Sequence, residues 1–303
     1  MRGRHGRVMP GLTLDQLRVF VAVAERQHMT AAARALNLAQ SAASAAIAGL
    51  EARHGVRLFH RVGRRIELTE AGRGFLSEAR AVLARAQAAE LMLGELGGTR
   101  RGILTVHASQ TIAAYWLPRH LVAFRRAWPA VEIRLTAGNT AEVAEALTIG
   151  AAELGFVEGT VDRPDLLGQE VARDRLVLVV GQDHPWAEIP PDAASLAAAE
   201  WVLREAGSGT RAAFETALSA QWGISPGALR VALELPSNEA VRAAVEAGLG
   251  ATVISAAVAA PGIEAGLLRL VALAFPDRAY RALYHRERPP GQVARALLGL
   301  MAG

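Results

Sequence analysis

Four short clusters of hydroxyl and amide side chains are candidates for binding a small ligand, because each follows a predicted strand and opens a predicted helix. Ligands of open α/β sheets bind at the carboxyl ends of strands. A helix N-terminus also offers free N–H groups and the positive end of its dipole to an anion. We therefore expect non-covalent binding of a small anion, such as sulfite, sulfate or a short carboxylate. The expected contacts are Ser109, Gln110, Thr111, Asn139, Thr140, Ser208, Thr210 and Asn238.

Each of these residues also fits the simpler role of a helix cap, but four clusters converging on one cleft favour a ligand. Glu158 is a further candidate contact, and Arg211 is expected close by. A carboxylate repels a purely anionic ligand. Glu158 is therefore expected either to contact an amine or a hydroxyl group of the ligand or to face solvent.

Alternating strands and helices must position these clusters. Such alternation is typical of parallel sheets that are covered by helices on both faces, and here it predicts two α/β lobes with a cleft between them. The predicted strands are residues 103–106, 131–135, 154–157, 176–180, 201–203, 231–235, 251–254 and 281–284. The predicted helices are residues 111–128, 140–149, 210–222, 238–247 and 291–300.

The N-terminal part of the chain has a different pattern, in which short helices follow one another. Thr13 is expected to cap a first helix, with Gln16 as its capping-box partner. Thr30 is expected to cap a second helix that ends near Leu36. Asn37 tolerates the left-handed conformation and is expected to end that helix.

A third helix is expected from residue 39 or 40 to His54, with Gly55 at its end. Two helices joined by a short turn, the second exposing small polar side chains at its start, are the geometry that enters a DNA major groove. Residues 56–68 then read as strand, turn and strand, with Arg64 and Arg65 near the tip. Arginines at such a tip can neutralise phosphates or enter a minor groove.

Charge and composition agree with a polyanion partner at one end of the chain. All 33 basic residues are arginine, and residues 1–100 hold 15 of them against 8 acidic residues. There is no cysteine, which excludes disulfides and thiolate metal sites. The histidines lack metal-binding spacing, and no nucleophile elbow, phosphate loop or dinucleotide motif is present. We therefore expect no metal, no cofactor and no enzyme activity.

With no apolar run of membrane-spanning length and no signal peptide, we expect a cytoplasmic protein without membrane contact.

The segments LDQLRVFVAVAE, TAAARALNLAQSAASAAIAGLE, GVRLF, GRR and LTEAG lie in order within residues 12–73. They resemble the winged helix-turn-helix of bacterial LysR-type transcriptional regulators. The resemblance implies contacts with double-stranded DNA through Thr30, Arg34, Gln40, Ser41, Ser44, Arg53, Arg61, Arg64 and Arg65. Gln40, Ser41 and Ser44 would contact base edges or nearby phosphates, and the arginines would contact the DNA backbone. This chain has Ala45 and Ala48 where the family often has longer polar side chains. We therefore expect the arginines to supply most of the affinity.

A long helix is expected after Thr69, with apolar residues at alternating spacings of four and three. This seam is typical of a helix that packs against a partner helix. The resemblance implies a homodimer formed through it, although packing on its own domain is the alternative. The seam residues are Phe75, Ala79, Val82, Ala86, Ala89, Leu93 and Leu96.

Residues 102–288 resemble the effector-binding half of the same family, which is similar to periplasmic binding proteins. We therefore expect a regulator whose DNA binding responds to a small molecule and which assembles as a dimer of dimers. RNA polymerase is a further expected partner. A solute-binding protein without a DNA role and a hydrolase are the alternatives.

The expected domains are a basic, disordered tail (1–11), a winged helix-turn-helix (12–68), a linker helix (69–98) and an effector-binding domain (101–303). In the last, residues 101–171 and 275–303 form one lobe and residues 172–274 the other.

Overall fold

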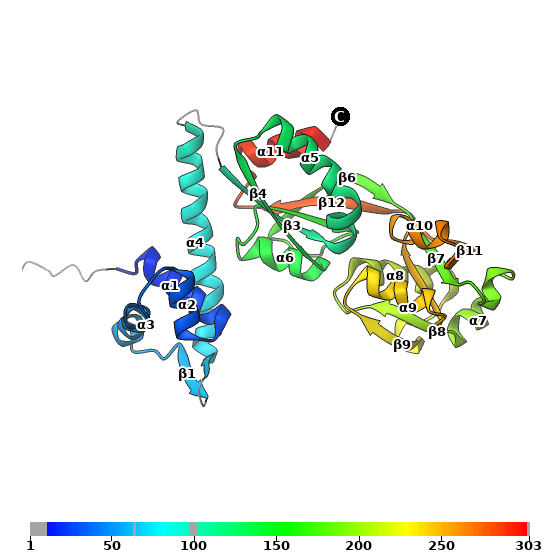
Figure 1. The fold of residues 1–303 in the computed structure, drawn as a ribbon, viewed down its shortest axis with the longest axis horizontal. Coiled ribbons are helices and arrows are strands. Elements are labelled where there is room, and N and C mark those ends of the chain that lie inside the picture. The colour runs from blue at the N-terminus through cyan, green and yellow to red at the C-terminus, as the bar shows by residue number, and fades with distance from the viewer. Residues whose placement is uncertain (1–10, 63–64, 97–101, 302–303) are drawn as a thin grey trace, which may run out of the picture. The chain divides into compact units, whose positions relative to one another are not determined.

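The computed structural model describes residues 11–62, 65–96 and 102–301. They form two compact units whose main boundary in the sequence lies between Leu91 and Met92, and Ile149–Ala151 group with the first unit. Apart from Gly11, the predicted basic tail lies outside the described residues. Figure 1 shows the helices and strands of both units. In this described part of the chain, no helix is both long and apolar enough to cross a membrane.

Three short helices begin the N-terminal unit: α1 (Leu14–Arg26), α2 (Met29–Ala35) and α3 (Gln40–His54). Thr13 caps α1 as predicted. Its hydroxyl accepts a hydrogen bond from the backbone N–H of Gln16 at 3.2 Å, and the Gln16 side chain accepts one from the N–H of Thr13 at 3.3 Å. This reciprocal pair satisfies two N–H groups that have no partner within the helix.

The cap of α2 is His28 and not Thr30, which lies inside the first turn. His28 has an extended backbone, and its Nδ1 accepts a hydrogen bond from the N–H of Ala31 at 3.3 Å. A neutral imidazole nitrogen is an acceptor, although histidine is not among the preferred cap residues. The predicted ends of α2 and α3 are confirmed, since Asn37 and Gly55 have φ angles of 54° and 65°.

A two-stranded hairpin follows, as predicted, formed by β1 (Phe59–Val62) and β2 (Arg65–Leu68) in antiparallel pairing. The buried ring of Phe20 on α1 lies 5.4 Å from the ring of Phe59 and 4.9 Å from the ring of Phe75. One aromatic cluster therefore joins the first helix, the hairpin and the long helix that follows.

The long helix α4 (Glu70–Leu96) has 27 residues and a length of roughly 40 Å. Thr69 caps it, as predicted. The Thr69 hydroxyl accepts a hydrogen bond from the N–H of Gly72 at 3.0 Å and donates one to the carbonyl of Arg57 at 2.7 Å. The same side chain therefore links the start of α4 to the loop that precedes β1.

The predicted seam of α4 is divided between two environments. Phe75 and Ala79 pack into the hydrophobic core of their own unit, where Ala79 is fully buried. Val82 is 44% exposed. Ala86 is partly exposed and Ala89 is exposed. The side chains of Leu93 and Leu96 lie outside the described residues. Among the described seam residues, self-packing, the alternative to dimerisation, accounts for Phe75 and Ala79.

The second unit contains two five-stranded sheets, one in each lobe. In the first lobe the strand order is β4-β3-β5-β12-β6. β3, β4 and β5 are parallel, as predicted, but β12 runs antiparallel to both β5 and β6. The strands are β3 (Gly102–Ser109), β4 (Val131–Gly138), β5 (Leu154–Glu158), β6 (Leu166–Asp174) and β12 (Arg278–His285).

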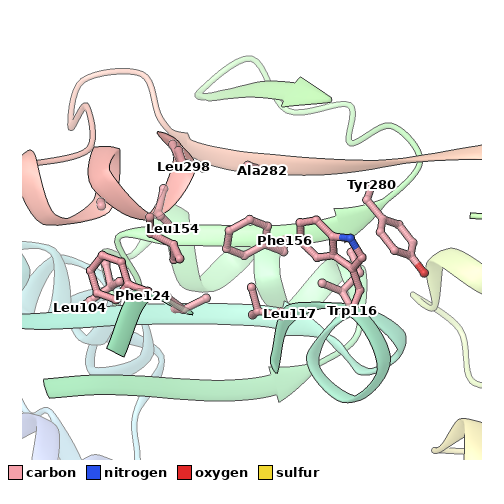
Figure 2. Close-up of a cluster of buried hydrophobic side chains, with 14 of the residues drawn as sticks. Leu104, Trp116, Leu117, Phe124, Leu154, Phe156, Tyr280, Ala282 and Leu298 are labelled. Atoms are coloured by element: carbon pink, nitrogen blue, oxygen red, sulfur yellow. The ribbon is translucent and has the colours of Figure 1, made fainter. Parts of the chain in front are cut away.

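Helices cover both faces of this sheet. α5 (Leu117–Ala127) and α11 (Gln292–Met301) pack on one face, and α6 (Thr140–Thr148) packs on the other. Figure 2 shows the core on the first face, where Trp116, Phe124 and Phe156 lie between the sheet and the helices. The single helix predicted for residues 111–128 instead contains a π-helical segment, η1 (Ile112–Trp116), before α5.

The second lobe repeats this plan with the strand order β11-β7-β10-β8-β9. β10, β8 and β9 are parallel, and β7 is antiparallel to both β10 and β11. The strands are β7 (Leu176–Gly181), β8 (Glu200–Arg204), β9 (Arg230–Leu235), β10 (Ala251–Ser255) and β11 (Leu268–Ala274). The helical segments are η2 (Pro185–Ala187), α7 (Ala193–Ala198), α8 (Gly209–Trp222), η3 (Pro226–Ala228), α9 (Asn238–Glu246) and α10 (Ala256–Glu264).

Two passages of the chain connect the lobes. β6 extends to Asp174 in the first sheet before β7 begins the second at Leu176, so this passage lies after the predicted position at residues 171–172. The chain returns between Ala274 and Arg278, in agreement with the prediction. Neither β6 nor β11 was predicted, and both have few buried residues along their length.

Candidate functional site

The start of α3 forms a polar and sterically open surface on the N-terminal unit. Gln40 and Ser41 are exposed, and the Gln40 side-chain amide donates a hydrogen bond to the hydroxyl of Ser44 at 2.9 Å. Ala45 and Ala48 are exposed on the same helix. The predicted base-reading residues therefore share one accessible surface, which carries few long side chains.

The predicted backbone-contacting arginines differ in their surroundings. Arg34 is exposed on α2. Arg53 donates a hydrogen bond to the carbonyl of Gly11 at 3.1 Å, so part of its guanidinium holds the start of the chain. The side chains of Arg61 and Arg65 and the whole of Arg64 lie outside the described residues. Their expected role remains a prediction.

In the second unit, the predicted polar clusters surround a narrow polar cavity that has no room for a water molecule in this structure. Eight of the nine predicted contacts line it, and the ninth, Asn238, is buried behind it and bonded to the lining residue Arg204. The lining residues are Ser109, Gln110, Thr111, Gly138, Asn139, Thr140, Glu158, Arg204, Ser208, Gly209 and Thr210. A ligand can enter only if the side chains that line the cavity move apart.

Strand ends and helix starts from both lobes position this lining, as the sequence pattern predicts. Gly138 and Gly209 let these segments approach closely. A Cβ atom on Gly138 would lie 2.6 Å from the Glu142 carboxylate and 2.8 Å from His107 Nε2. A Cβ atom on Gly209 would lie 2.6 Å from the hydroxyl of Thr140. A side chain at either position would therefore displace the neighbouring polar side chains that line the cavity.

Arg204, which the sequence analysis missed, organises one wall of the cavity. It is buried and forms two hydrogen bonds to Glu205, at 2.8 and 2.9 Å, and one to Asn238 Oδ1 at 2.8 Å. Burial by itself raises the pKa of Glu205, but hydrogen bonds from Arg204, the backbone and Asn139 bring that pKa below its usual value. The charge of Arg204 is therefore largely balanced within the protein.

Asn238, which is bonded to Arg204, also forms hydrogen bonds to residues of the first lobe. Its Nδ2 donates a hydrogen bond to the hydroxyl of Thr111 at 3.0 Å, and its backbone N–H donates one to Gln110 Oε1 at 3.0 Å. Two of the predicted contacts, Gln110 and Thr111, are thus already held by the second lobe. Asn238 acts here as a structural link between the lobes.

A second buried network lies where the two connecting passages run side by side. Arg278 donates two hydrogen bonds to Asp174 Oδ2, at 2.8 and 2.7 Å, and one to the hydroxyl of Thr210 at 2.9 Å. Ser255 donates to the other Asp174 oxygen at 2.7 Å. Burial, followed by the negative charge of Asp174, raises the pKa of the neighbouring Tyr280. Asp174 and Arg278 were not predicted, because they are 104 positions apart in the sequence.

Two hydroxyl groups of the cavity have no hydrogen-bond partner among the described residues. They are Ser109 Oγ, on a residue that is 3% exposed, and Thr140 Oγ1. Buried polar atoms in native proteins nearly always have a partner. Both hydroxyls line the space described above, so a polar ligand placed there would complete their hydrogen bonding.

Arg211 is not part of the lining. It forms ion pairs with Glu215 and Glu234 and donates a hydrogen bond to the carbonyl of Arg204. Among the described residues, no cluster of histidine and acidic side chains is arranged to hold a metal ion.

The exposed helix-turn-helix with its hairpin, together with a two-lobed unit enclosing a small polar cavity, defines a DNA-binding regulator with an effector-binding domain. The chain belongs to the LysR family of bacterial transcriptional regulators. Residues 14–73 match the family model for the bacterial regulatory helix-turn-helix protein, lysR family. Residues 97–303 match the model for the LysR substrate binding domain.

Individual relatives agree with this assignment. The uncharacterized HTH-type transcriptional regulator YeiE of Escherichia coli K12 is 35% identical over 289 residues, covering 95% of this chain and 96% of that protein. The structure of full-length CbnR complexed with target DNA is 27% identical, with a TM-score of 0.67 over 96% of this chain and 97% of that one. The regulatory domain of Synechocystis PCC6803 CcmR in complex with 2-PG is 26% identical, with a TM-score of 0.60 over 67% of this chain and 96% of that one.

Proposed function

We propose that a small anionic effector, an oxyanion or a short carboxylate, binds in the cavity of the second unit and thereby changes how the N-terminal unit binds DNA. The observation that carries this proposal is the pair of buried hydroxyls, Ser109 Oγ and Thr140 Oγ1, which line the cavity without partners. The helical turn at residues 110–111 that leads into η1, together with α6 and α8, directs its N-terminus to the same space. The CcmR complex with 2-PG supports a small effector in a related domain.

On the DNA side, α3 is proposed to enter the major groove, with Gln40, Ser41 and Ser44 at base edges or nearby phosphates. Thr30 and Arg34 on α2, together with Arg53 and the hairpin arginines, would contact the DNA backbone. The structure of CbnR bound to its target DNA supports this mode of binding.

Self-association is proposed to use the exposed part of the α4 seam. Val82, Ala86 and Ala89 are the described members, and Leu93 and Leu96 continue the seam in the sequence. A homotetramer built from such dimers would bind two neighbouring half-sites. Contact with RNA polymerase is proposed as the step by which the bound tetramer acts on transcription.

We expect the Arg64→Ala, Arg65→Ala double variant to bind DNA roughly tenfold more weakly at about 100 mM salt, because two phosphate contacts are lost. The slope of log affinity against log salt should fall by about 2. Fluorescence anisotropy with a mixed-sequence duplex over a range of salt concentrations measures both quantities. The matched control is Arg18→Ala, Arg26→Ala, which removes the same charge from exposed positions on α1. Equal losses in the two variants would mean that net charge, and not the hairpin, carries the affinity.

We expect Ser109→Ala to weaken effector binding roughly tenfold, because a buried hydrogen bond to a charged ligand is lost. Calorimetry on the full chain, with inorganic phosphate, sulfite, sulfate, acetate and glycolate as probes, measures this effect. The control Ser77→Ala removes a hydroxyl of α4 that donates only to the carbonyl of Gly74. If none of these anions bound the unsubstituted chain, or if Ser109→Ala left every affinity unchanged, the proposed site would be wrong.

A further inference from the structure

Glu158 places a buried carboxylate inside the cavity without a close ion pair. The residue is 3% exposed and lines the space at the end of β5. The cation that faces it is Arg278, whose guanidinium nitrogen is 4.0 Å from Glu158 Oε1. That guanidinium already donates three hydrogen bonds, two to Asp174 and one to Thr210. Arg278 therefore pairs mainly with Asp174. The carboxylate oxygens of Glu158 can still accept hydrogen bonds from a ligand.

The Glu158 carboxylate also lies against the start of α8. A Cβ atom on Gly209, the first residue of α8, would lie 3.1 Å from Glu158 Oε2 and 2.6 Å from Thr140 Oγ1. The carboxylate thus lies beside the helix N-terminus and next to one of the two unpartnered hydroxyls. A ligand that bonds to Thr140 Oγ1 beside Gly209 therefore also lies near Glu158.

A carboxylate beside an anion site favours ligands that carry an O–H or N–H group over ligands that carry none. An ionised carboxylate can only accept hydrogen bonds, and at short distance in a buried site it strongly repels a ligand oxygen that carries no hydrogen. A ligand that presents an O–H or N–H group gains a charge-assisted hydrogen bond at the same place. The hydroxyls of Ser109 and Thr140 can donate to the acidic oxygens of that ligand.

We propose that the effector is a small anionic acid that carries its own hydrogen-bond donor and directs it at Glu158. This inference rests on the proposed effector site and narrows the class of ligand. Singly protonated tetrahedral oxyanions and α-hydroxy or α-amino carboxylates share the required chemistry. Sulfate and simple carboxylates do not, so they are poor ligands in this scheme.

Two ligand pairs, each with one member that carries a hydrogen-bond donor and one that does not, test the proposal by calorimetry on the full chain at pH 7. Phosphate carries an O–H group at this pH and sulfate does not, while glycolate carries a hydroxyl that acetate lacks. We expect the donor-bearing member of at least one pair to bind roughly tenfold more tightly or better. The pair that shows the preference distinguishes a tetrahedral effector from a carboxylate effector.

Substitutions at Glu158 connect the preference to this residue. Glu158→Gln offers an amide donor, so it should remove or reverse the preference within the pair. Glu158→Asp keeps the carboxylate and should preserve the order of affinities even if binding weakens. Glu170→Gln removes the same charge from an exposed position on β6, where Glu170 pairs with Arg173, and should change nothing.

Each other outcome overturns the inference in a distinct way. If sulfate and acetate bound as tightly as phosphate and glycolate while Ser109→Ala weakened them all, the effector site would stand and the role of Glu158 would be wrong. A preference that survived Glu158→Gln unchanged would also exclude this role. If none of the four probes bound, the inference would fail together with the proposed anionic effector site.

Discussion

The Arg278→Met variant is expected to lose about 3–5 kcal/mol of the free energy of unfolding of the second unit, because it leaves buried carboxylates without a counter-ion. Asp174 would lose two hydrogen bonds from the guanidinium, and Glu158 would lose the cation 4.0 Å away. Both carboxylates are nearly inaccessible to water. Urea unfolding followed by tryptophan emission measures this loss, since all five tryptophans belong to the second unit.

The matched control is Arg173→Met, which removes the same side chain from an exposed ion pair with Glu170 at 2.9 Å. Exposed pairs contribute at most about 1 kcal/mol, so the two variants should differ by several-fold in destabilisation. The double variant Asp174→Asn, Arg278→Met should recover part of the loss, because one of the uncompensated charges is removed with its partner. If Arg278→Met and Arg173→Met destabilised the second unit equally, the buried network would have no special role in holding the two passages together.

Local features of the site were predictable from the sequence. Ser109, Asn139, Ser208 and their neighbours were found because a strand end followed directly by a helix start is a pattern of adjacent residues. Eight of nine predicted contacts line the cavity for that reason. The same holds for the Thr13 capping box and for the left-handed Asn37 and Gly55, whose signals are contained within a few positions.

Features that depend on distant partners were not predictable in this way. Arg204 bonds to Asn238, and Asp174 bonds to Arg278. In each pair one strand end meets a segment from elsewhere in the fold, and of these residues only Asn238 has a local signature, the helix start at which it lies. The only available signal was a charged residue placed directly after an apolar strand, as in Trp201-Val202-Leu203-Arg204.

The part of the α4 seam that packs within its own unit could not be separated from the rest by sequence alone. Heptad spacing identifies an apolar stripe but not what covers it. Phe75 and Ala79 are covered by α1 and the hairpin of their own unit, while Val82 stays exposed. The strands β6 and β11 were not predicted. They bury few side chains, so their sequences lack a clear alternation of apolar and polar residues.

The Gly72→Ala variant is expected to destabilise the N-terminal unit by about 3 kcal/mol and to reduce DNA affinity accordingly, because the added methyl group has no room. A Cβ atom at Gly72 would lie 2.1 Å from the backbone carbonyl oxygen of Leu58 and 2.9 Å from Leu68 Cδ2. The Leu58 carbonyl cannot simply move away, since it accepts a hydrogen bond from the N–H of Thr69 at 3.0 Å. The glycine of the LTEAG segment therefore marks the place where α4 crosses the base of the hairpin.

Gly74 on the same helix provides the control, since a Cβ atom there would meet nothing within 4 Å. Gly74→Ala should stabilise the unit by up to about 1 kcal/mol, because alanine favours helix more than glycine does. Temperature-dependent DNA binding by anisotropy compares the two variants. Their tryptophan emission should stay unchanged, since no tryptophan lies before Met92. Opposite signs for two identical substitutions two residues apart would show that the close approach at Leu58, and not helix propensity, makes glycine necessary at position 72. Equal effects at both positions would contradict this packing of α4 on the hairpin.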